Sequence, residues 1–183
     1  LQQVLDKLRP LLEDEQVCKY GQNIKYDTSI LARYGITPRG FDFDTMIADY
    51  LLDPTERQHN LDALAQTHLN YTMMPITELI GKGKEQIGFA EVDPEKACHY
   101  ASEDADITLR LVEVLQPQLQ EREMSTLFEQ VEMPLVGVLR DMELHGVAID
   151  THFLQKFSAN LGSDLDGLKT RIYELAGEEF NIN

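Results

Sequence analysis

The sequence predicts an α/β fold in which short parallel strands alternate with helices. Residues 17–21 form a short strand candidate, and helical spacing follows it over residues 27–34. Residues 41–46 alternate between polar and apolar as a second strand does, and a helical segment again follows, to Leu52. Strands that alternate with helices favour one α/β layer with parallel pairing. The 183 residues are enough to bury a sizeable core.

The strands and helices of the first half can be placed from their apolar spacing and their capping residues. Residues 1–12 predict an amphipathic helix with no capping residue before it. Asp27 is expected to cap the helix that Gly35 ends, and His59-Asn60 the helix over residues 61–69.

The second half is predicted to be almost wholly helical. Asp93 and Pro94 are typical of a helix start, and a long helix is expected after them. Beyond Pro117, apolar residues continue at helical spacing until Gly146, and Asp150 is expected to cap the last helix. The near-heptad spacing of that helix predicts that it packs against another helix.

Composition limits the classes of partner. The formal net charge of -16 argues against nonspecific binding to a polyanion, because counterion release needs clustered Lys and Arg. Any contact with nucleic acid is therefore expected to be local, mediated by metal ions, or helped by another part of a larger protein. No apolar run approaches the roughly 20 residues that span a bilayer, so a cytoplasmic protein without a membrane partner is expected. Cys18 and Cys98 are expected to be buried, reduced thiols.

Three side chains form the candidate catalytic set: Asp27, Tyr100 and Asp104. Tyr100 and Asp104 are four residues apart on a predicted helix, so they share one face. Two carboxylates can hold divalent cations beside a phosphate, while a phenol can orient a water. Read singly, Asp27 is an ordinary helix cap, and Tyr100 with Asp104 is a half-buried tyrosine beside a solvated acid. His59 and His68 are expected to be ordinary polar surface.

The residues of these segments resemble a known family. Gly21–Asp27 and His99–Asp106 resemble the second and third motifs of the proofreading 3′→5′ exonuclease domain of bacterial DNA polymerase I, a family A polymerase. Five further segments resemble their counterparts in that family: Phe43–Met46, His59–Ala65, Gly81–Lys84, Glu132–Asp150 and Gly177–Asn181.

The resemblance implies a ribonuclease-H-like exonuclease fold that lacks its first strands, followed by helices that lead into the polymerase thumb. It divides the chain into an exonuclease domain, residues 1–122, and a helical connection to the polymerase region, residues 123–183. The expected partners are the single-stranded or frayed 3′ end of DNA and the remainder of the polymerase chain. The expected location is the bacterial cytoplasm, in association with the nucleoid.

The resemblance also implies roles for single residues at the metal site. Asp104 would bind a metal ion directly, and Asp27 would support a second metal through waters. Tyr100 would position the attacking water, and Asn23 would contact the 3′ end. Mg²⁺ or Mn²⁺ suits such oxygen-rich sites.

Three more residues are candidates for contact with DNA. Ile76 stands where the family often has an aromatic residue that wedges the terminal base, so it is expected to hold that base less firmly. Lys82 and Lys84 are expected either to contact a phosphate or to lie in a solvated turn.

The family's first motif, Asp-x-Glu on an opening strand, is expected to precede Leu1. Without its two acids, the isolated chain is expected to be inactive and to self-associate through an uncovered sheet. Two alternatives stay open: a ribonuclease D-like 3′→5′ exoribonuclease, and a degenerate exonuclease domain that serves only as a scaffold. The sequence after Pro134 disfavours the first, and the presence of Asp27, Tyr100 and Asp104 disfavours the second.

Overall fold

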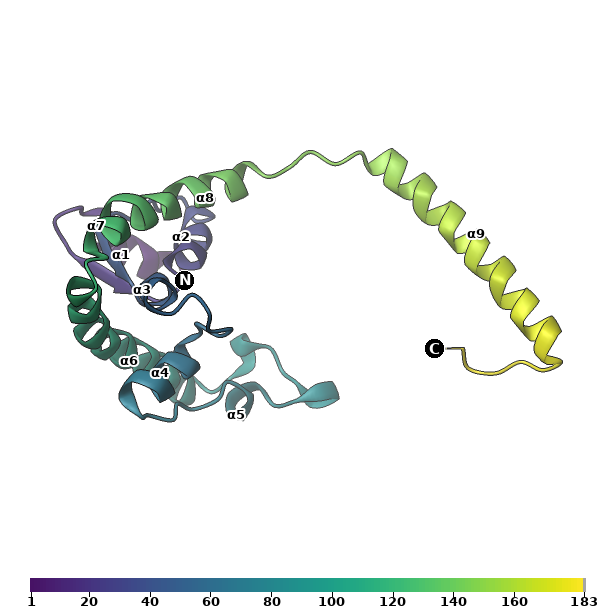
Figure 1. Ribbon diagram of the computed structural model, residues 1–183, viewed down its shortest axis with the longest axis horizontal. Coiled ribbons are helices and arrows are strands. Elements are labelled where there is room, and N and C mark those ends of the chain that lie inside the picture. The colour runs from purple at the N-terminus through teal and green to yellow at the C-terminus, as the bar shows by residue number, and fades with distance from the viewer. Residues whose placement is uncertain (183) are drawn as a thin grey trace. The chain divides into compact units, whose positions relative to one another are not determined.

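The computed structural model describes residues 1–182. Its first half alternates helices with two short strands, and its second half is helical (Figure 1). The first-half elements are α1 (Gln2–Glu13), β1 (Lys19–Gly21), α2 (Ile24–Ala32), β2 (Phe41–Asp44), α3 (Thr45–Leu52), α4 (Leu61–Leu69) and α5 (Thr77–Ile80). The others are η1 (Gly83–Glu85), η2 (Phe89–Glu91), α6 (Pro94–Glu121), α7 (Ser125–Leu127), η3 (Phe128–Glu132), α8 (Met133–His145) and α9 (Thr151–Ala176).

The two strands pair in parallel, as the alternation of strands with helices predicts. Tyr20 lies opposite Phe43 and Gly21 opposite Asp44, with an irregularity in register between Lys19 and Tyr20. Both strands end at the same edge of the sheet, and a helix begins shortly after each. Polar side chains of the two strand-to-helix junctions therefore meet at this edge, where ligands commonly bind in α/β folds.

The helix starts that the sequence predicts are confirmed at most junctions. Asn60, Asp93 and Asp150 each accept hydrogen bonds from backbone N–H groups in the first turn of α4, α6 and α9. The prediction that Asp27 caps its helix is wrong, because α2 begins at Ile24 and Asp27 lies in the first turn.

The core lies between α3, α4, α6 and the segment after α6. α6 contributes the largest share of its buried apolar side chains, and Figure 1 shows α6 running beside α4. The buried members of this core are Phe43, Ala48, Leu52, Leu64, Ala65, Met73, Ile107, Leu111, Val112, Leu115, Leu119 and Phe128. Phe128 opens the π-helical segment η3 and stacks at a tilt on Phe43, with ring centroids 4.8 Å apart.

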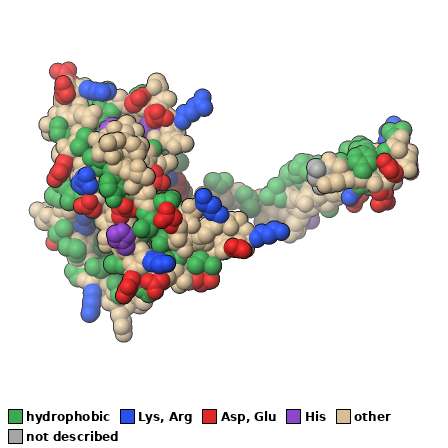
Figure 2. Space-filling view, turned by 90° about the horizontal axis from the view of Figure 1, so that it is seen from below, with side chains coloured by type: hydrophobic (Ala, Val, Ile, Leu, Met, Phe, Trp, Pro, Cys, Tyr) green, Lys and Arg blue, Asp and Glu red, His purple; other side chains and the backbone are tan. Residues whose placement is uncertain are grey.

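Internal contacts divide the chain into two compact units, Leu1–His145 and Gly146 onward. The second unit consists of α9 and its flanking residues, and its apolar side chains are exposed. Phe157 is 50% exposed and Leu165 65% exposed. Figure 2 shows hydrophobic and acidic side chains mixed on the surface of this unit. The expected helical packing partner of α9 is not among the described residues of its own unit.

Candidate metal-dependent nuclease site

The turn between β1 and α2 is held by a carboxylate from the next strand. Asn23 has a left-handed backbone (φ 58°, ψ 49°), a conformation that asparagine tolerates better than most residues. Its N–H donates to Asp44 at 3.1 Å, and the N–H of Ile24 donates to the same carboxylate at 2.8 Å. Asp44 thus caps α2, and the side chain of Asn23 can face the neighbouring pocket instead.

Asp44 also begins α3, because its Oδ1 accepts from the N–H of Met46 at 2.9 Å. The side chain is 1% exposed. Burial raises the pKa of Asp44, and the N–H groups from which it accepts oppose that rise. One buried carboxylate therefore fixes both helix starts at the carboxyl end of the sheet.

A cavity of about 710 Å³ opens beside these helix starts. α2 contributes Asp27 to its wall, the turn before α2 contributes Asn23, and α6 contributes Asp104. The other lining residues are Tyr20, Gly21, Gln22, Met46, Asn60, Leu61, Ala101, Ala105, Thr108 and Leu109. The structure therefore brings together Asn23, Asp27 and Asp104, which sequence reasoning proposed from two separate segments.

The carboxyl groups of this pocket lie in a negative environment. Desolvation raises the pKa of Asp27, and the charge of Asp44 raises it further. Desolvation also raises the pKa of Asp104, as do the charges of Asp62 and Glu103. Carboxylates that are partly desolvated and repelled by their neighbours gain from a bound cation, which would offset both effects.

Tyr100 lies one helical turn before Asp104 and is half-buried. Its ring packs edge-on against Phe89, with centroids 6.4 Å apart. Desolvation and then the charge of Asp104 raise the pKa of Tyr100, so the phenol stays protonated near neutral pH. A protonated phenol can donate a hydrogen bond to orient a water, but it cannot act there as a base.

The donor chemistry of the pocket suits Mg²⁺ or Mn²⁺, which prefer carboxylate oxygens and water. Asp27 and Asp104 are the two acids among its lining residues. Within residues 1–182, no group of three or more His, Cys, Asp or Glu side chains is arranged to hold a metal ion. Carboxylates are therefore suitable ligands for such a cation, while the described residues hold no complete set of ligands.

The remaining predicted DNA-binding residues follow α4 in the sequence and lie around α5. Ile76 immediately precedes α5 and is 43% exposed. Lys82 and Lys84 lie at η1, and both are exposed. Among the described residues, the wall of the 710 Å³ cavity includes none of these three.

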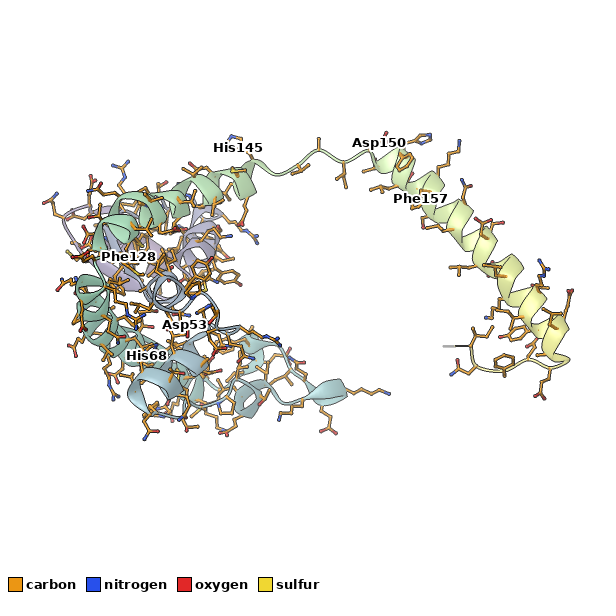
Figure 3. The ribbon with its side chains drawn as sticks, in the orientation of Figure 1. Asp53, His68, Phe128, His145, Asp150 and Phe157 are labelled. Atoms are coloured by element: carbon orange, nitrogen blue, oxygen red, sulfur yellow. The ribbon has the colours of Figure 1, made fainter. Side chains whose placement is uncertain are left out.

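The prediction that His59 and His68 are ordinary polar surface is wrong. His59 Nδ1 lies 2.6 Å from Asp49 Oδ2, and His68 Nε2 lies 2.6 Å from Asp49 Oδ1. Asp49 is 6% exposed. Figure 3 shows His68 near Asp53, and both residues line a second, smaller pocket. No spacing signal in the sequence connects these histidines, because Asp49 lies on a different helix.

The His59 contact bears on the larger cavity. The side chain of Gln22, a cavity-lining residue, donates to the carbonyl of His59 at 2.7 Å. Asn60 and Leu61, which follow His59, also line the cavity. Asp49 and His59 therefore hold one wall of the candidate site in place from outside it.

The expectation of buried thiols is also wrong, since Cys18 and Cys98 are both exposed. In the part of the chain that the structure describes, no helix has the length and apolar character needed to cross a membrane.

Comparison with known proteins assigns most of the chain to one sequence family. The sequence model of the 3′-5′ exonuclease family matches residues 1–120, which contain Asn23, Asp27, Tyr100 and Asp104. The chain belongs to the 3′-5′ exonuclease family. DNA polymerase I of Rhizobium leguminosarum is 43% identical over 182 residues, and that of Pseudomonas aeruginosa is 40% identical over 182 residues.

These two relatives contain much more than the exonuclease family segment. The alignments cover 100% and 98% of this chain but only 18% and 20% of the Rhizobium and Pseudomonas proteins, respectively. The chain thus spans about a fifth of the length of the curated relatives that it matches.

Solved structures support the α/β exonuclease fold. The POL domain of Pol1 from M. smegmatis has a TM-score of 0.70 at 24% identity, with 96% of this chain and 27% of that chain covered. Brucella melitensis NrnC has a TM-score of 0.63 at 25% identity, with 79% of this chain and 68% of that chain covered. The predicted ribonuclease-H-like exonuclease fold is confirmed.

Proposed function

We propose that this chain is part of a DNA polymerase I and forms most of its proofreading 3′→5′ exonuclease domain. The observation that carries the proposal is the shared cavity: Asp27 and Asp104 come from separate helices and line it together with Asn23. The family match over residues 1–120 supports the same reading. The substrate is the single-stranded or frayed 3′ end of DNA, and the location is the bacterial cytoplasm, at the nucleoid.

The reaction is hydrolysis of the last phosphodiester bond. A water oxygen attacks the terminal phosphorus, the bond from phosphorus to the 3′ oxygen of the preceding nucleotide breaks, and that oxygen takes up a proton. The products are a nucleoside 5′-monophosphate and a strand one residue shorter. Two divalent cations, Mg²⁺ or Mn²⁺, stabilise the attacking and leaving oxygens when bound.

Each candidate residue has a separate task in this scheme. Asp104 would hold one cation directly, and Asp27 would support the other through waters. Tyr100, held protonated, orients the attacking water. Asn23 contacts the 3′-terminal nucleotide. Its side chain can do so because it makes no capping hydrogen bond to α2.

The DNA contacts outside the cavity are Ile76, Lys82 and Lys84. Ile76 offers an exposed apolar surface to the terminal base, although an aliphatic side chain stacks less well than an aromatic one. The ammonium groups of Lys82 and Lys84, at η1, contact backbone phosphates.

The isolated chain is inactive in this scheme, because two carboxylates are too few for a two-metal site. A two-metal site needs further carboxylates, and in this scheme the rest of a DNA polymerase I supplies them. The rest of the polymerase is accordingly the main protein partner. In its absence, the uncovered edge of the β1–β2 sheet favours pairing with a second copy of the chain.

Kinetics with the full-length polymerase test this function. Asp104→Ala and Asp27→Ala are expected to slow Mg²⁺-dependent trimming of single-stranded DNA by about 10²–10³-fold, the range found when one electrostatic stabiliser is removed. Polymerisation by the same preparations serves as the control for folding. Faster trimming of RNA than of DNA would favour a ribonuclease D-like enzyme, and no trimming of either would favour a scaffold.

A further inference from the structure

Glu103 lies on the same face of α6 as Tyr100 and directly before Asp104. It is half-buried, and both of its carboxylate oxygens accept hydrogen bonds from a single distant segment. Oε1 accepts from the hydroxyl of Tyr71 at 2.8 Å, and Oε2 accepts from the backbone N–H of Met74 at 2.9 Å. One side chain thus connects the α6 turn that carries the candidate catalytic residues to residues 71–76.

Residues 70–75 have no helical or strand structure, so their position depends on side-chain contacts. Met73 is buried in the core, and the Arg110 guanidinium lies over the Tyr71 ring at 5.7 Å from its centroid. Glu103 is the acceptor for Met74, two residues before Ile76. The exposed Ile76 therefore stands at the end of a segment that is tied to α6 through Glu103.

We propose that Glu103 is a positioning residue, which fixes segment 71–76 against the α6 turn of Tyr100 and Asp104 and so places the 3′-terminal nucleotide relative to that turn. The proposal rests on the exonuclease function proposed above. Glu103 does not touch the reacting atoms. It acts through Ile76, and its loss changes how the terminus is held more than how the bond is broken.

The two bonds require a carboxylate with the reach of glutamate. Glutamine offers one acceptor oxygen, so it cannot accept from both Tyr71 and Met74 as the carboxylate does. Aspartate keeps the charge but is one methylene shorter, so it separates the effect of charge from that of reach. Tyr71→Phe removes one bond from the other side and leaves Glu103 in place.

The test combines steady-state kinetics with amide hydrogen exchange in the full-length polymerase. For Mg²⁺-dependent trimming of single-stranded DNA, Glu103→Gln and Glu103→Asp are expected to raise KM roughly 3- to 10-fold, the range for losing one hydrogen bond, with kcat within about twofold. Exchange at the Met74 amide is expected to accelerate. Glu113→Gln, an exposed acid on the same helix, is expected to change neither value.

Two further variants keep the test decisive. Tyr71→Phe is expected to raise KM in the same direction, and combining it with Glu103→Gln is expected to add less than the sum of the single effects. Faster exchange at Met74 with unchanged KM would overturn the positioning role. Unchanged trimming by Asp104→Ala would overturn the exonuclease function itself, which is a separate result. If Glu103→Gln does not fold, Tyr71→Phe decides alone.

Discussion

At the scale of single residues, the fold places several carboxyl groups of the candidate site close enough to repel one another. The pKa of Asp104 is raised by burial and by its neighbours Asp62 and Glu103, and that of Asp27 by burial and by Asp44. Such an arrangement costs stability when no cation is bound. Because a bound cation would offset this cost, the pocket is expected to respond to divalent cations.

The response to cations is the first prediction at this scale. Mg²⁺ or Mn²⁺ is expected to raise the Tm of residues 1–183 at pH 7, because it relieves the repulsion and binds only the folded chain. Asp104→Asn is expected to raise Tm without cation, by roughly 2–4 °C per kcal/mol of relieved repulsion, and to reduce the cation effect. Glu113→Gln is the matched control, with a cation response equal to that of the parent.

The pH dependence of this response follows from the direction of the pKa shifts. The carboxyl pKa values of Asp27, Asp44 and Asp104 lie above their usual 3.8 in the folded chain. Their contribution to the unfolding free energy is therefore greatest below that value and is lost as pH rises through the raised pKa values. The cation-induced increase in Tm is expected to be absent at a pH below about 3.8 and to grow across the same window. A pH-independent increase would contradict the account.

Asp44 carries the second residue-scale prediction. Asp44→Ala leaves the N–H groups of Asn23, Ile24 and Met46 without their acceptor, so the free energy of unfolding is expected to fall by about 2–4 kcal/mol. Urea denaturation of Asp44→Ala beside Asp42→Ala, an exposed neighbour on the same strand, measures this difference. Equal stability of the two variants would show that Asp44 is not the cap that orders the turn.

Sequence patterns predicted the candidate acids but not the group that organises them. Asp27, Tyr100 and Asp104 stand in recognisable local motifs, so the sequence alone was enough to propose them. Asp44 accepts from N–H groups 20 and 21 residues earlier, and local periodicity carries no information about such a bond. For the same reason Asp27 was expected to cap α2, whereas the Asp44 carboxylate on β2 accepts from the N–H groups at the start of that helix.

At the scale of elements, the wall of the cavity at α4 depends on contacts behind it. Asp49 on α3 is bonded to His59 before α4 and to His68 within α4. Tyr50 also packs edge-on against His59, with ring centroids 5.6 Å apart. These contacts hold α4 against α3. Asn60 and Leu61 lie at the start of α4, so the position of their part of the cavity wall depends on the same contacts.

Replacing Asp49 tests this support. Asp49→Asn keeps one acceptor oxygen for two histidines, so the free energy of unfolding is expected to fall by about 1–2 kcal/mol. In the full-length polymerase, the KM for single-stranded DNA is expected to rise as well, because the cavity wall at α4 loosens. Asp53→Asn, exposed at the end of α3, is the control. If Asp49→Asn lowers the free energy of unfolding but leaves KM unchanged, the position of α4 does not affect substrate binding.

Element boundaries were predictable where a cap or a breaker is local. Asn60, Asp93 and Asp150 start their helices and Gly146 follows the end of α8, as expected. Apolar spacing was a poorer guide to burial beyond residue 127. Val138 and Met142 keep helical spacing yet are 55% and 64% exposed. Spacing identifies an apolar face but not whether the same chain supplies its partner.

At the scale of the whole molecule, the chain consists of two units, and the first holds both the core and the candidate site. Residues 146–150 connect the units with exposed side chains and no helix or strand. The boundary between 122 and 123, expected from the resemblance, remains a prediction about function. Phe128 and Met133 pack with the core of the first unit beyond that boundary.

Limited proteolysis tests this division. Low concentrations of a broad-specificity protease are expected to cut residues 1–183 first within 146–150, because an exposed segment without helix or strand is opened at little cost. The fragment that ends near residue 145 is expected to keep the Tm of the parent within about 2 °C, since it contains the core. First cleavage inside α6, or a large loss of Tm in the fragment, would contradict the division.

The central claim is that Asp27, Tyr100 and Asp104 belong to a proofreading exonuclease site. The most direct measurement is the rate at which the full-length polymerase releases a mispaired 3′-terminal nucleotide from a primer, with Mg²⁺ and without dNTPs. We predict release of one nucleotide at a time and a loss of about 10²–10³-fold in Asp104→Ala, with polymerisation retained. Equal release by the parent and Asp104→Ala would contradict the account.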